Sequence, residues 1–385
     1  SPLASMCAAL AGGLMLGASG ATADVLTVAL DGSGDYTAIQ GAIDASTDGD
    51  TILIGPGSYD ESLNTGGKNI TLRGINGYPQ TILDPGGDSA TLLSINGGET
   101  GLLIEGMTFR NGQNNSMTEI NNDSAADFVS CRWLGGTAYS GAGLLMSGAT
   151  VSFTDCQWVS NQTTNTGGAI DATNCTLTFN GGKFITNQNS GEKGGAMWVA
   201  DCTLDMTGTE FTSNQCNSGS TSGGGAIYMR TSGGTWTDCE FDGNSASSDS
   251  NAYGGDVQLE QASPVVTGCT FTGGEASTYR DSSSNYTLNS EGGSFYLGGG
   301  SSPVYSNVTF DSCIAESEAI TFTSCSGNKY SNARSRGGAI YCSSSCNASF
   351  LNTQFVQCES FAKGNGISDC GNSSRGHVST SAYGG

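Results

Sequence analysis

The stretch FITNQNSGEKGGAM, residues 184–197, decides the fold because both of its ends recur along the chain. Its first end is an aromatic residue followed three positions later by asparagine, and it returns at residues 158–161, 211–214 and 241–244. Its second end is a Gly-Gly pair, and successive pairs are 27, 30, 30, 38 and 45 residues apart. These pairs begin at Gly167, Gly194, Gly224, Gly254, Gly292 and Gly337. A repeat of about 20 to 50 residues predicts a solenoid.

Composition agrees with a solenoid of short strands. The 385 residues include 60 Gly and only 6 Pro, and 12% of residues are charged. Many tight turns and little helix are expected from such a mixture. Because one repeat runs through most of the chain, we expect a single elongated body rather than several domains.

The repeat settles into a regular form from Cys131 onward. Each copy has a strand ending in the aromatic-x-x-Asn motif, a variable polar loop, a Gly-Gly-Ala-Ile strand and a further strand such as residues 175–179. Three short strands in each turn of about 25 to 30 residues are what a parallel β-helix requires. The sequence therefore predicts an all-β, single-stranded parallel β-helix with three strands per coil.

The N-terminal region carries a family resemblance. DGSGDYTAIQ, residues 31–40, and GDTILIGPGSY, residues 49–59, resemble the opening of pectin-lyase-like right-handed parallel β-helix proteins, pectin methylesterases among them. The resemblance implies a right-handed helix whose open end is covered by a short α-helix. A cap is also physically required, since the first coil would otherwise expose its core.

These motifs divide the chain into four parts. We expect an N-terminal strand and capping helix at 24–50, the β-helix at 51–368, and a polar tail at 369–385. Residues 1–23 contain no charged side chain and end in small residues, as in an export signal. A retained membrane anchor or a helix that contacts other subunits remains an alternative for this segment.

The balance of charge excludes some partners. The net charge is −22, from 13 basic and 35 acidic residues. A general nucleic-acid or anionic-membrane surface needs basic patches, so neither is expected. The acidic excess fits solubility, with cation binding, calcium being one candidate ion, as the alternative.

Cysteine usage favours disulfides over zinc. There are 14 Cys, no Cys-x-x-Cys pair and a single histidine, His377. Disulfides indicate an oxidising compartment, so we expect an exported protein in the extracellular space, at the cell surface or in an organelle lumen. Free thiols stacked inside the solenoid are equally allowed. The aligned pairs are Cys131 with Cys156, Cys175 with Cys202, Cys239 with Cys269, and Cys313 with Cys358.

Period-two alternation separates the inward and outward positions of the Gly-Gly-Ala-Ile strands. The predicted inward residues are Ile170, Met197, Ile227, Val257, Phe295 and Ile340. The outward neighbours are Asp171, Trp198, Tyr228, Gln258, Tyr296 and Tyr341. The aromatic members of this outward set form a candidate stripe that binds a glycan or a protein surface. Alternatively, the rings stack only to stabilise the sheet.

No catalyst is evident. The Asn-Thr-Asp, Gly-His-Gly and Arg-Ile-Lys motifs that the pectin-lyase resemblance would imply for a polygalacturonase do not occur. Basic residues are scattered over different parts of the repeat, and His377 falls in the polar tail. Long loops at residues 276–293 and 316–336 are the other places where function is expected.

The repeats themselves are similar to those of chlamydial polymorphic outer-membrane proteins, which implies a surface adhesin. The leading hypothesis is therefore a non-catalytic exported β-helix that acts as a surface, adhesive or scaffold subunit. One alternative is a polysaccharide lyase or hydrolase of the same fold. Another is a lumenal or extracytoplasmic subunit of a membrane complex, anchored by residues 1–23 and in contact with the other subunits.

Overall fold

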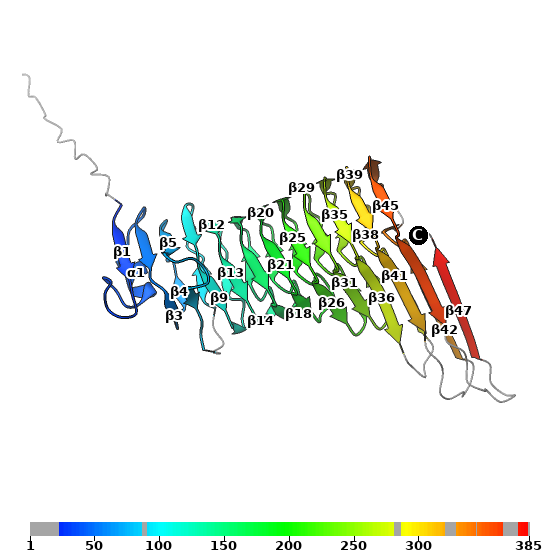
Figure 1. Cartoon of the computed structure of the whole chain (residues 1–385), viewed down its shortest axis with the longest axis horizontal. Helices are drawn as coiled ribbons and strands as arrows, with labels where there is room; N and C mark the ends of the chain where they lie inside the picture. The colour runs from blue at the N-terminus through cyan, green and yellow to red at the C-terminus, as the bar shows by residue number, and fades with distance from the viewer. Residues whose placement is uncertain are drawn as a thin grey trace, which may run out of the picture.

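The chain forms a right-handed parallel β-helix, a long solenoid whose strands stack in register from one end to the other (Figure 1). The computed structural model describes residues 23–86, 91–280, 286–319, 329–343, 345–364 and 376–383. The predicted export or anchor segment therefore lies, except for Ala23, outside the described residues.

A short helix closes the N-terminal end, as predicted. It is α1 (Ile39–Ala45), which packs beside β1 (Val25–Val28) and buries its apolar face in the core. Both oxygens of the Glu61 carboxylate accept hydrogen bonds from the first two N–H groups of the helix, at 2.8 and 2.9 Å. Lys68 donates to two carbonyl groups of the last turn. Opposite charges therefore stabilise the two ends of the helix dipole.

Four sheets run along the solenoid axis, and we number them in the order in which a coil passes through them. The first sheet contains β1, β2 (Thr51–Ile54), β5 (Thr71–Gly74), β8 (Leu102–Glu105), β12 (Ala125–Val129), β16 (Thr150–Thr154), β20 (Thr176–Asn180), β24 (Thr203–Thr207), β29 (Thr235–Thr237), β34 (Val265–Thr267), β39 (Val304–Ser306) and β44 (Ser349–Leu351). The second sheet contains β3 (Gly57–Tyr59), β6 (Thr81–Leu83), β9 (Thr108–Arg110), β13 (Arg132–Leu134), β17 (Gln157–Val159), β21 (Lys183–Ile185), β25 (Glu210–Thr212), β30 (Glu240–Asp242), β35 (Thr270–Thr272), β40 (Thr309–Asp311) and β45 (Gln354–Val356).

The other two sheets complete each coil. The third sheet contains β10 (Gln113–Asn114), β14 (Thr137–Ser140), β18 (Gln162–Thr166), β22 (Gln188–Asn189), β26 (Gln215–Ser218), β31 (Ser245–Ser248), β36 (Glu275–Arg280), β41 (Ile314–Ala319) and β46 (Glu359–Gly364). The fourth sheet contains β4 (Leu63–Asn64), β7 (Leu93–Ile95), β11 (Thr118–Ile120), β15 (Leu144–Ser147), β19 (Ile170–Thr173), β23 (Met197–Ala200), β28 (Ile227–Arg230), β33 (Val257–Glu260), β38 (Phe295–Gly298) and β43 (Ile340–Cys342).

A coil in the middle of the solenoid thus has four strands, one more than the three expected. The extra strand is the segment between the asparagine and the Gly-Gly pair, which the sequence presents as a variable loop. Its backbone pairs with the same segment of the neighbouring coils, for example Gln188 with Gln215. Variable side chains are compatible with this strand because the pairing uses only backbone groups.

The last coils carry a second layer, which we call the fin. It consists of β26, β31, β36, β41 and β46 facing a five-stranded sheet, and it lengthens toward the C-terminal end (Figure 1). The five-stranded sheet contains β27 (Thr221–Gly223), β32 (Asn251–Tyr253), β37 (Tyr286–Glu291), β42 (Lys329–Arg336) and β47 (Gly376–Tyr383). The long loops predicted at 276–293 and 316–336 are therefore largely paired strands, since successive insertions stack in register. Part of the predicted polar tail is β47.

An aromatic column fills the core of the solenoid. Its members are Phe109, Trp133, Trp158, Phe184, Phe211, Phe241, Phe271, Phe310 and Phe355. Neighbouring ring centroids are 4.3 to 5.3 Å apart, and the ring planes are within 21° of parallel. Each contact of this kind contributes about 0.5–1.5 kcal/mol beyond the burial of its area.

An asparagine ladder runs beside the aromatic column, and its members are Asn161, Asn187, Asn214 and Asn244. Each side-chain amide donates to the amide oxygen of the next asparagine, at 3.0, 2.9 and 2.9 Å for the three steps. Each also donates to a backbone carbonyl of the preceding coil, as Asn187 does to Trp158. The ladder therefore satisfies buried polar groups, so these asparagines have a structural role.

The Gly-Gly pairs form a sharp corner. Gly167 has a φ of 51°, which a side chain would strain. A Cβ on Gly168 would lie 2.0 Å from the carbonyl oxygen of Gly195 in the next coil. The first glycine of a pair is thus required for its conformation, and the second for close approach of backbones.

Candidate binding surface

The predicted inward face of the Gly-Gly-Ala-Ile strands is confirmed, whereas Asp171, Tyr228 and Gln258 of the predicted outward set are buried. Backbone pairing stacks the predicted outward residues in one column across β19, β23, β28, β33, β38 and β43. The inward residues are fully buried up to Phe295, and Ile340 in the last of these strands is half-buried. Register was therefore readable from the repeat, because a slip of one residue would exchange the two faces.

The outward column is not a continuous exposed stripe. Trp198, Tyr296 and Tyr341 are half-buried, as a binding surface requires. Tyr228, however, is only 1% exposed, so the prediction that it is exposed is wrong. The Nζ of Lys193 lies 4.7 Å from the centre of the Tyr228 ring and 3.3 Å from its hydroxyl. Lys193 comes from the corner of the preceding coil and covers this ring.

Toward the C-terminal end the exposed rings gather into what we call the tyrosine cluster, which consists of Tyr253, Tyr296, Tyr341, Glu291 and Arg336. The ring centroids of Tyr253 and Tyr296 are 4.6 Å apart, and those of Tyr296 and Tyr341 are 5.8 Å apart. All three rings are half-buried. Tyr253 and the two charged residues end strands of the fin, whereas Tyr296 and Tyr341 belong to the fourth sheet. The cluster thus lines the corner where the fin joins the solenoid.

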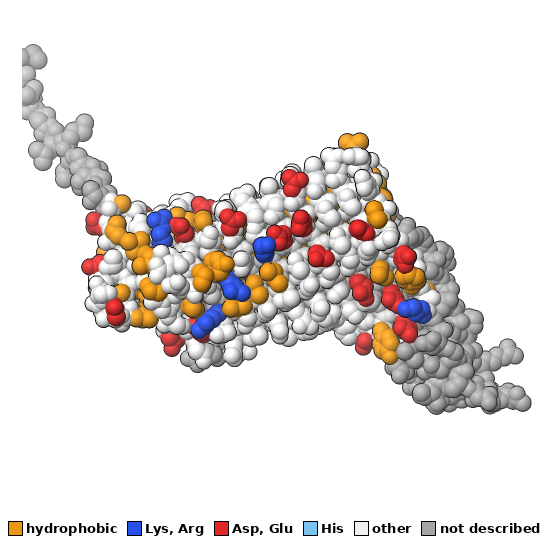
Figure 2. All heavy atoms as spheres, in the orientation of Figure 1, with side chains coloured by type: hydrophobic (Ala, Val, Ile, Leu, Met, Phe, Trp, Pro, Cys, Tyr) orange, Lys and Arg blue, Asp and Glu red, His pale blue; other side chains and the backbone are white. Residues whose placement is uncertain are grey.

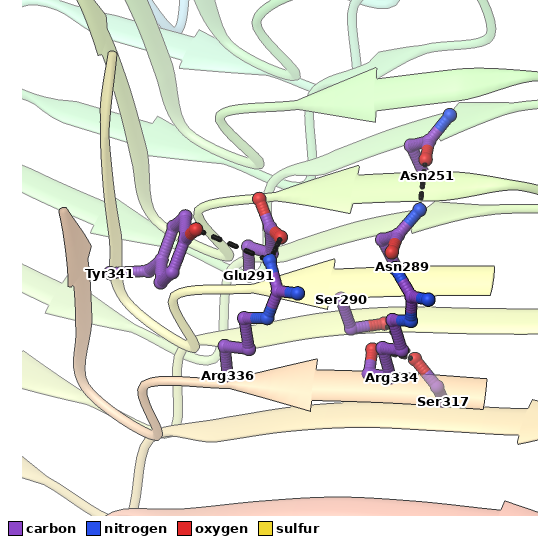
Figure 3. A network of polar contacts seen from close by, with 8 residues as sticks. All are labelled: Asn251, Asn289, Ser290, Glu291, Ser317, Arg334, Arg336 and Tyr341. Atoms are coloured by element: carbon purple, nitrogen blue, oxygen red, sulfur yellow. Dashed lines mark hydrogen bonds and ion pairs between the residues drawn. The ribbon is translucent and has the colours of Figure 1, made fainter. Parts of the chain in front are cut away.

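An ion pair holds one side of the cluster in place (Figure 3). The Nη1 of Arg336 lies 2.7 Å from the Oε1 of Glu291 and donates to the hydroxyl of Tyr341 at 3.3 Å. The guanidinium group also lies over the Tyr341 ring, 5.7 Å from its centre. These contacts fix the orientation of a ring that would otherwise be free to rotate on the surface.

Burial shifts the protonation equilibria of the cluster. It raises the pKa of Glu291, and the neighbouring Arg336 offsets part of this rise. Burial also raises the pKa of Tyr253, and it raises the pKa of Tyr296 to about 12. The hydroxyls of Tyr253 and Tyr296 therefore stay neutral over the physiological range, as donors and acceptors for a ligand.

The sequence reading missed Tyr253, Glu291 and Arg336. A signal for them exists, since each immediately precedes a Gly-Gly pair and the three are in register with one another. All three residues lie in segments that the sequence predicts to be variable loops. The repeat pattern therefore did not predict that they stack against the outward column.

The eight predicted cysteines stack as aligned, but the structure has free thiols in place of the predicted disulfides. Side chains in register on parallel strands point in the same direction, and several thiols donate to a carbonyl of the preceding coil, as Cys156 does to Phe128 at 3.4 Å. Contact with Cys202 lowers the pKa of Cys175 to about 7. Contact with Cys313 likewise lowers the pKa of Cys358 to about 7.

Two further features of the surface bear on function. Charged side chains are sparse on the face shown in Figure 2, and carboxylates outnumber cations over the whole chain. Among the residues that the structure describes, no three or more His, Cys, Asp or Glu side chains gather as a metal site would need.

Within the described ranges, no helix has both the length and the apolar character needed to cross a membrane.

Comparison with known proteins finds few similarities. No protein-family model and no curated protein matches the chain. Among solved structures, a pectin methylesterase from carrot is similar, with 17% sequence identity and a TM-score of 0.31, over 64% of this chain and 73% of that chain.

Proposed function

We propose that the chain is a non-catalytic, exported β-helix that acts as a surface, adhesive or scaffold subunit and binds a glycan or a protein surface through the tyrosine cluster. The observation that carries the proposal is the row formed by Tyr253, Tyr296 and Tyr341, three half-buried rings in successive coils. Tyrosine is suited to binding because its ring offers apolar area, its hydroxyl a hydrogen bond, and its two side-chain torsions little entropy to lose.

The rigid strands that carry the tyrosine rings strengthen this proposal. Tyr296 and Tyr341 stand on paired strands of the fourth sheet, and their inward neighbours pack in the core. A ligand would therefore meet side chains that are already in place, which reduces the entropic cost of binding. Neutral hydroxyls and one internally neutralised ion pair suit an uncharged polar ligand such as a saccharide.

The pairing of Glu291 favours binding over catalysis. A glycosidase needs two carboxyl groups about 5 to 10 Å apart, one of them protonated. Arg336 contacts Glu291 directly and offsets part of the rise in its pKa that burial causes, so this carboxyl group is less suited to donating a proton than a buried glutamate without a cation beside it.

The test is a glycan array probed with the purified chain and with Tyr296→Ala. We expect the wild-type protein to retain defined glycans and the variant to lose at least tenfold in affinity. Tyr139→Ala is the matched control, because Tyr139 is 68% exposed on β14, away from the cluster. Equal loss in both variants, or binding unaffected by either, would contradict the assignment of the cluster.

The enzymatic alternative rests on the raised pKa of Glu291 beside an arginine. If the chain is a polysaccharide lyase or hydrolase, incubation with polysaccharides should release new reducing ends, and Glu291→Gln should abolish this release. If no glycan that the chain binds on the array is cleaved, the result favours the binding role over the enzymatic one.

Export, the adhesive role implied by the similarity to chlamydial repeats, and attachment to a membrane complex are proposals that depend on residues 1–23. N-terminal sequencing of the mature protein separates them. Cleavage near Ala23 supports export in free form and excludes the anchor, whereas a retained segment that co-purifies with other subunits supports the complex.

A further inference from the structure

Two neighbouring coils break the repeat in a matched way. The residue after each Gly-Gly pair is alanine in four coils, but it is Asp256 in the coil that begins with Gly254. The residue three positions after the column aromatic is asparagine in four successive coils, but it is Gly274 after Phe271. The asparagine ladder should therefore end without a partner at Asn244.

The two departures compensate for each other in space. The Asp256 side chain is fully buried, and its Oδ1 accepts a hydrogen bond from the Nδ2 of Asn244 at 2.9 Å. This is the length of the preceding step, in which Asn214 donates to Asn244. A Cβ on Gly274 would lie 2.2 Å from the Oδ2 of Asp256. Asp256 thus occupies the space that an asparagine at position 274 would fill.

The surroundings of Asp256 favour a neutral acid. Its Oδ2 and the hydroxyl oxygen of Ser294 are both buried and interact with each other, but neither makes a hydrogen bond of good geometry. The titratable groups that interact electrostatically with Asp256 are the exposed Asp242 on β30 and the thiol of Cys313. Burial raises the pKa of Asp256 to about 7. Hydrogen bonding with Asn244 and Ser294 offsets part of this rise, and the like charge of Asp242 adds to it. A proton on Oδ2 could be donated to Ser294, which would satisfy both buried oxygens.

We propose that Asp256 is a buried, protonated carboxylic acid that ends the asparagine ladder in place of a side chain at Gly274, and that loss of its proton loosens the coils on either side. The packing between the central coils and the coils that hold the tyrosine cluster would then depend on pH.

The direction of the effect follows from linkage. The folded state holds the proton to a higher pH than the unfolded chain, in which aspartate titrates near 3.8. Stability contributed by this group therefore falls as pH rises from about 4 to about 7 and is constant above that range. A shift of this size, about three pKa units, corresponds to a change of about 10³-fold in the unfolding equilibrium.

The first experiment compares the full chain with Asp256→Asn, which keeps the shape of the neutral acid and cannot ionise. We expect the melting temperature of the wild type to fall relative to that of the variant as pH rises from 5 to 8, and infrared difference spectra to show a protonated carboxyl band that the variant lacks. Parallel pH profiles, or no such band at pH 5, would overturn the proposal.

The second experiment tests whether Asp256 replaces an asparagine side chain at position 274. Gly274→Asn alone should be strongly destabilising, because its side chain would collide with Asp256. Asp256→Ala alone should leave Asn244 without an acceptor. The double variant restores the alanine and asparagine of the three preceding coils, so it should recover most of the loss and should also abolish the pH profile. Additive losses would contradict the compensation, and if a single variant fails to fold, the double variant and the infrared band still decide the outcome.

Discussion

The central coils, residues 125–242, and the C-terminal coils, residues 245–364, place the same motifs in very different surroundings. In the central coils the rings of the aromatic column are fully buried between neighbours on both sides. In the last C-terminal coil, Phe350 is 47% exposed and Phe355 is 52% exposed. The C-terminal coils also bear the long strands of the fin and the tyrosine cluster.

This difference shows that the position in the repeat determines which type of residue is present. How much that residue contributes to the free energy of unfolding depends on the coils beside it. A solenoid is stabilised chiefly by contacts between adjacent repeats. A residue with coils on both sides should therefore contribute more than its equivalent beside an exposed surface, and four sets of variants can test this.

The largest difference should come from the aromatic column. Phe211→Ala removes a ring packed between Phe184 and Phe241 and should cost about 3–5 kcal/mol. Phe355→Ala removes a ring that is half solvated, so its cost should be about 1 kcal/mol. Urea unfolding of both variants measures the difference, and equal midpoints would show that burial in the column is not what distinguishes the two regions.

A smaller difference is expected for the buried amides. Asn214→Ala leaves both the backbone N–H and the side-chain amide of Asn187 without their acceptor, at a cost of about 2–4 kcal/mol. Asn289→Ala removes one partly buried contact with Asn251 in the fin (Figure 3) and should cost about 0.5 kcal/mol. Thermal melts compare the two variants, and a larger loss for Asn289→Ala would contradict the role of the ladder.

The fin should respond locally. Inside it, the hydroxyl of Ser317 contacts those of Thr278 and Ser290 at 2.9 and 3.0 Å and donates to the carbonyl of Arg334 at 2.7 Å. Ser317→Ala should cost about 1–2 kcal/mol and increase hydrogen exchange in β36 and β41 while leaving the central coils protected. Ser152→Ala, in an exposed contact with Asp127, is the matched control and should change little. Exchange that rises equally in both regions would argue against an independent fin.

The smallest expected effect is the pH dependence from Glu291. Burial raises its folded-state pKa above the ordinary value, so its contribution to stability falls as pH rises through the range in which a glutamate ordinarily titrates and up to the raised value. Glu291→Gln should remove this slope and leave the profile due to Asp256 intact. Melting temperatures at closely spaced pH values provide the measurement, and an unchanged slope in the variant would show that folding does not shift the titration of Glu291.

Much of the fold could be predicted because the repeat and the strand period are local. The aromatic column, the asparagine ladder and the two glycines of each corner all follow from residue type and spacing, and the capping helix at Ile39–Ala45 follows from the apolar spacing of its residues. For the candidate site, the same reasoning placed Trp198, Tyr296 and Tyr341 in one outward column.

What could not be predicted depends on contacts between coils. Lys193 covers Tyr228 from a neighbouring coil, Tyr253 reaches Tyr296 from the fin, and the long insertions become strands only because successive insertions match in length. A one-dimensional pattern contains the residues but not these distances.

By itself, the sequence determined that this chain is a parallel β-helix and which side chains face its interior, because a period of two and a repeat of nearly constant length allow only one register. Only the tertiary structure decided which outward rings stay exposed, that the aligned cysteines are free thiols, and that Asp256 replaces the missing side chain at Gly274. The physical reason is that burial, and therefore the energy and protonation of each group, is determined by neighbours that lie 25 or more residues away along the chain but in direct contact in space.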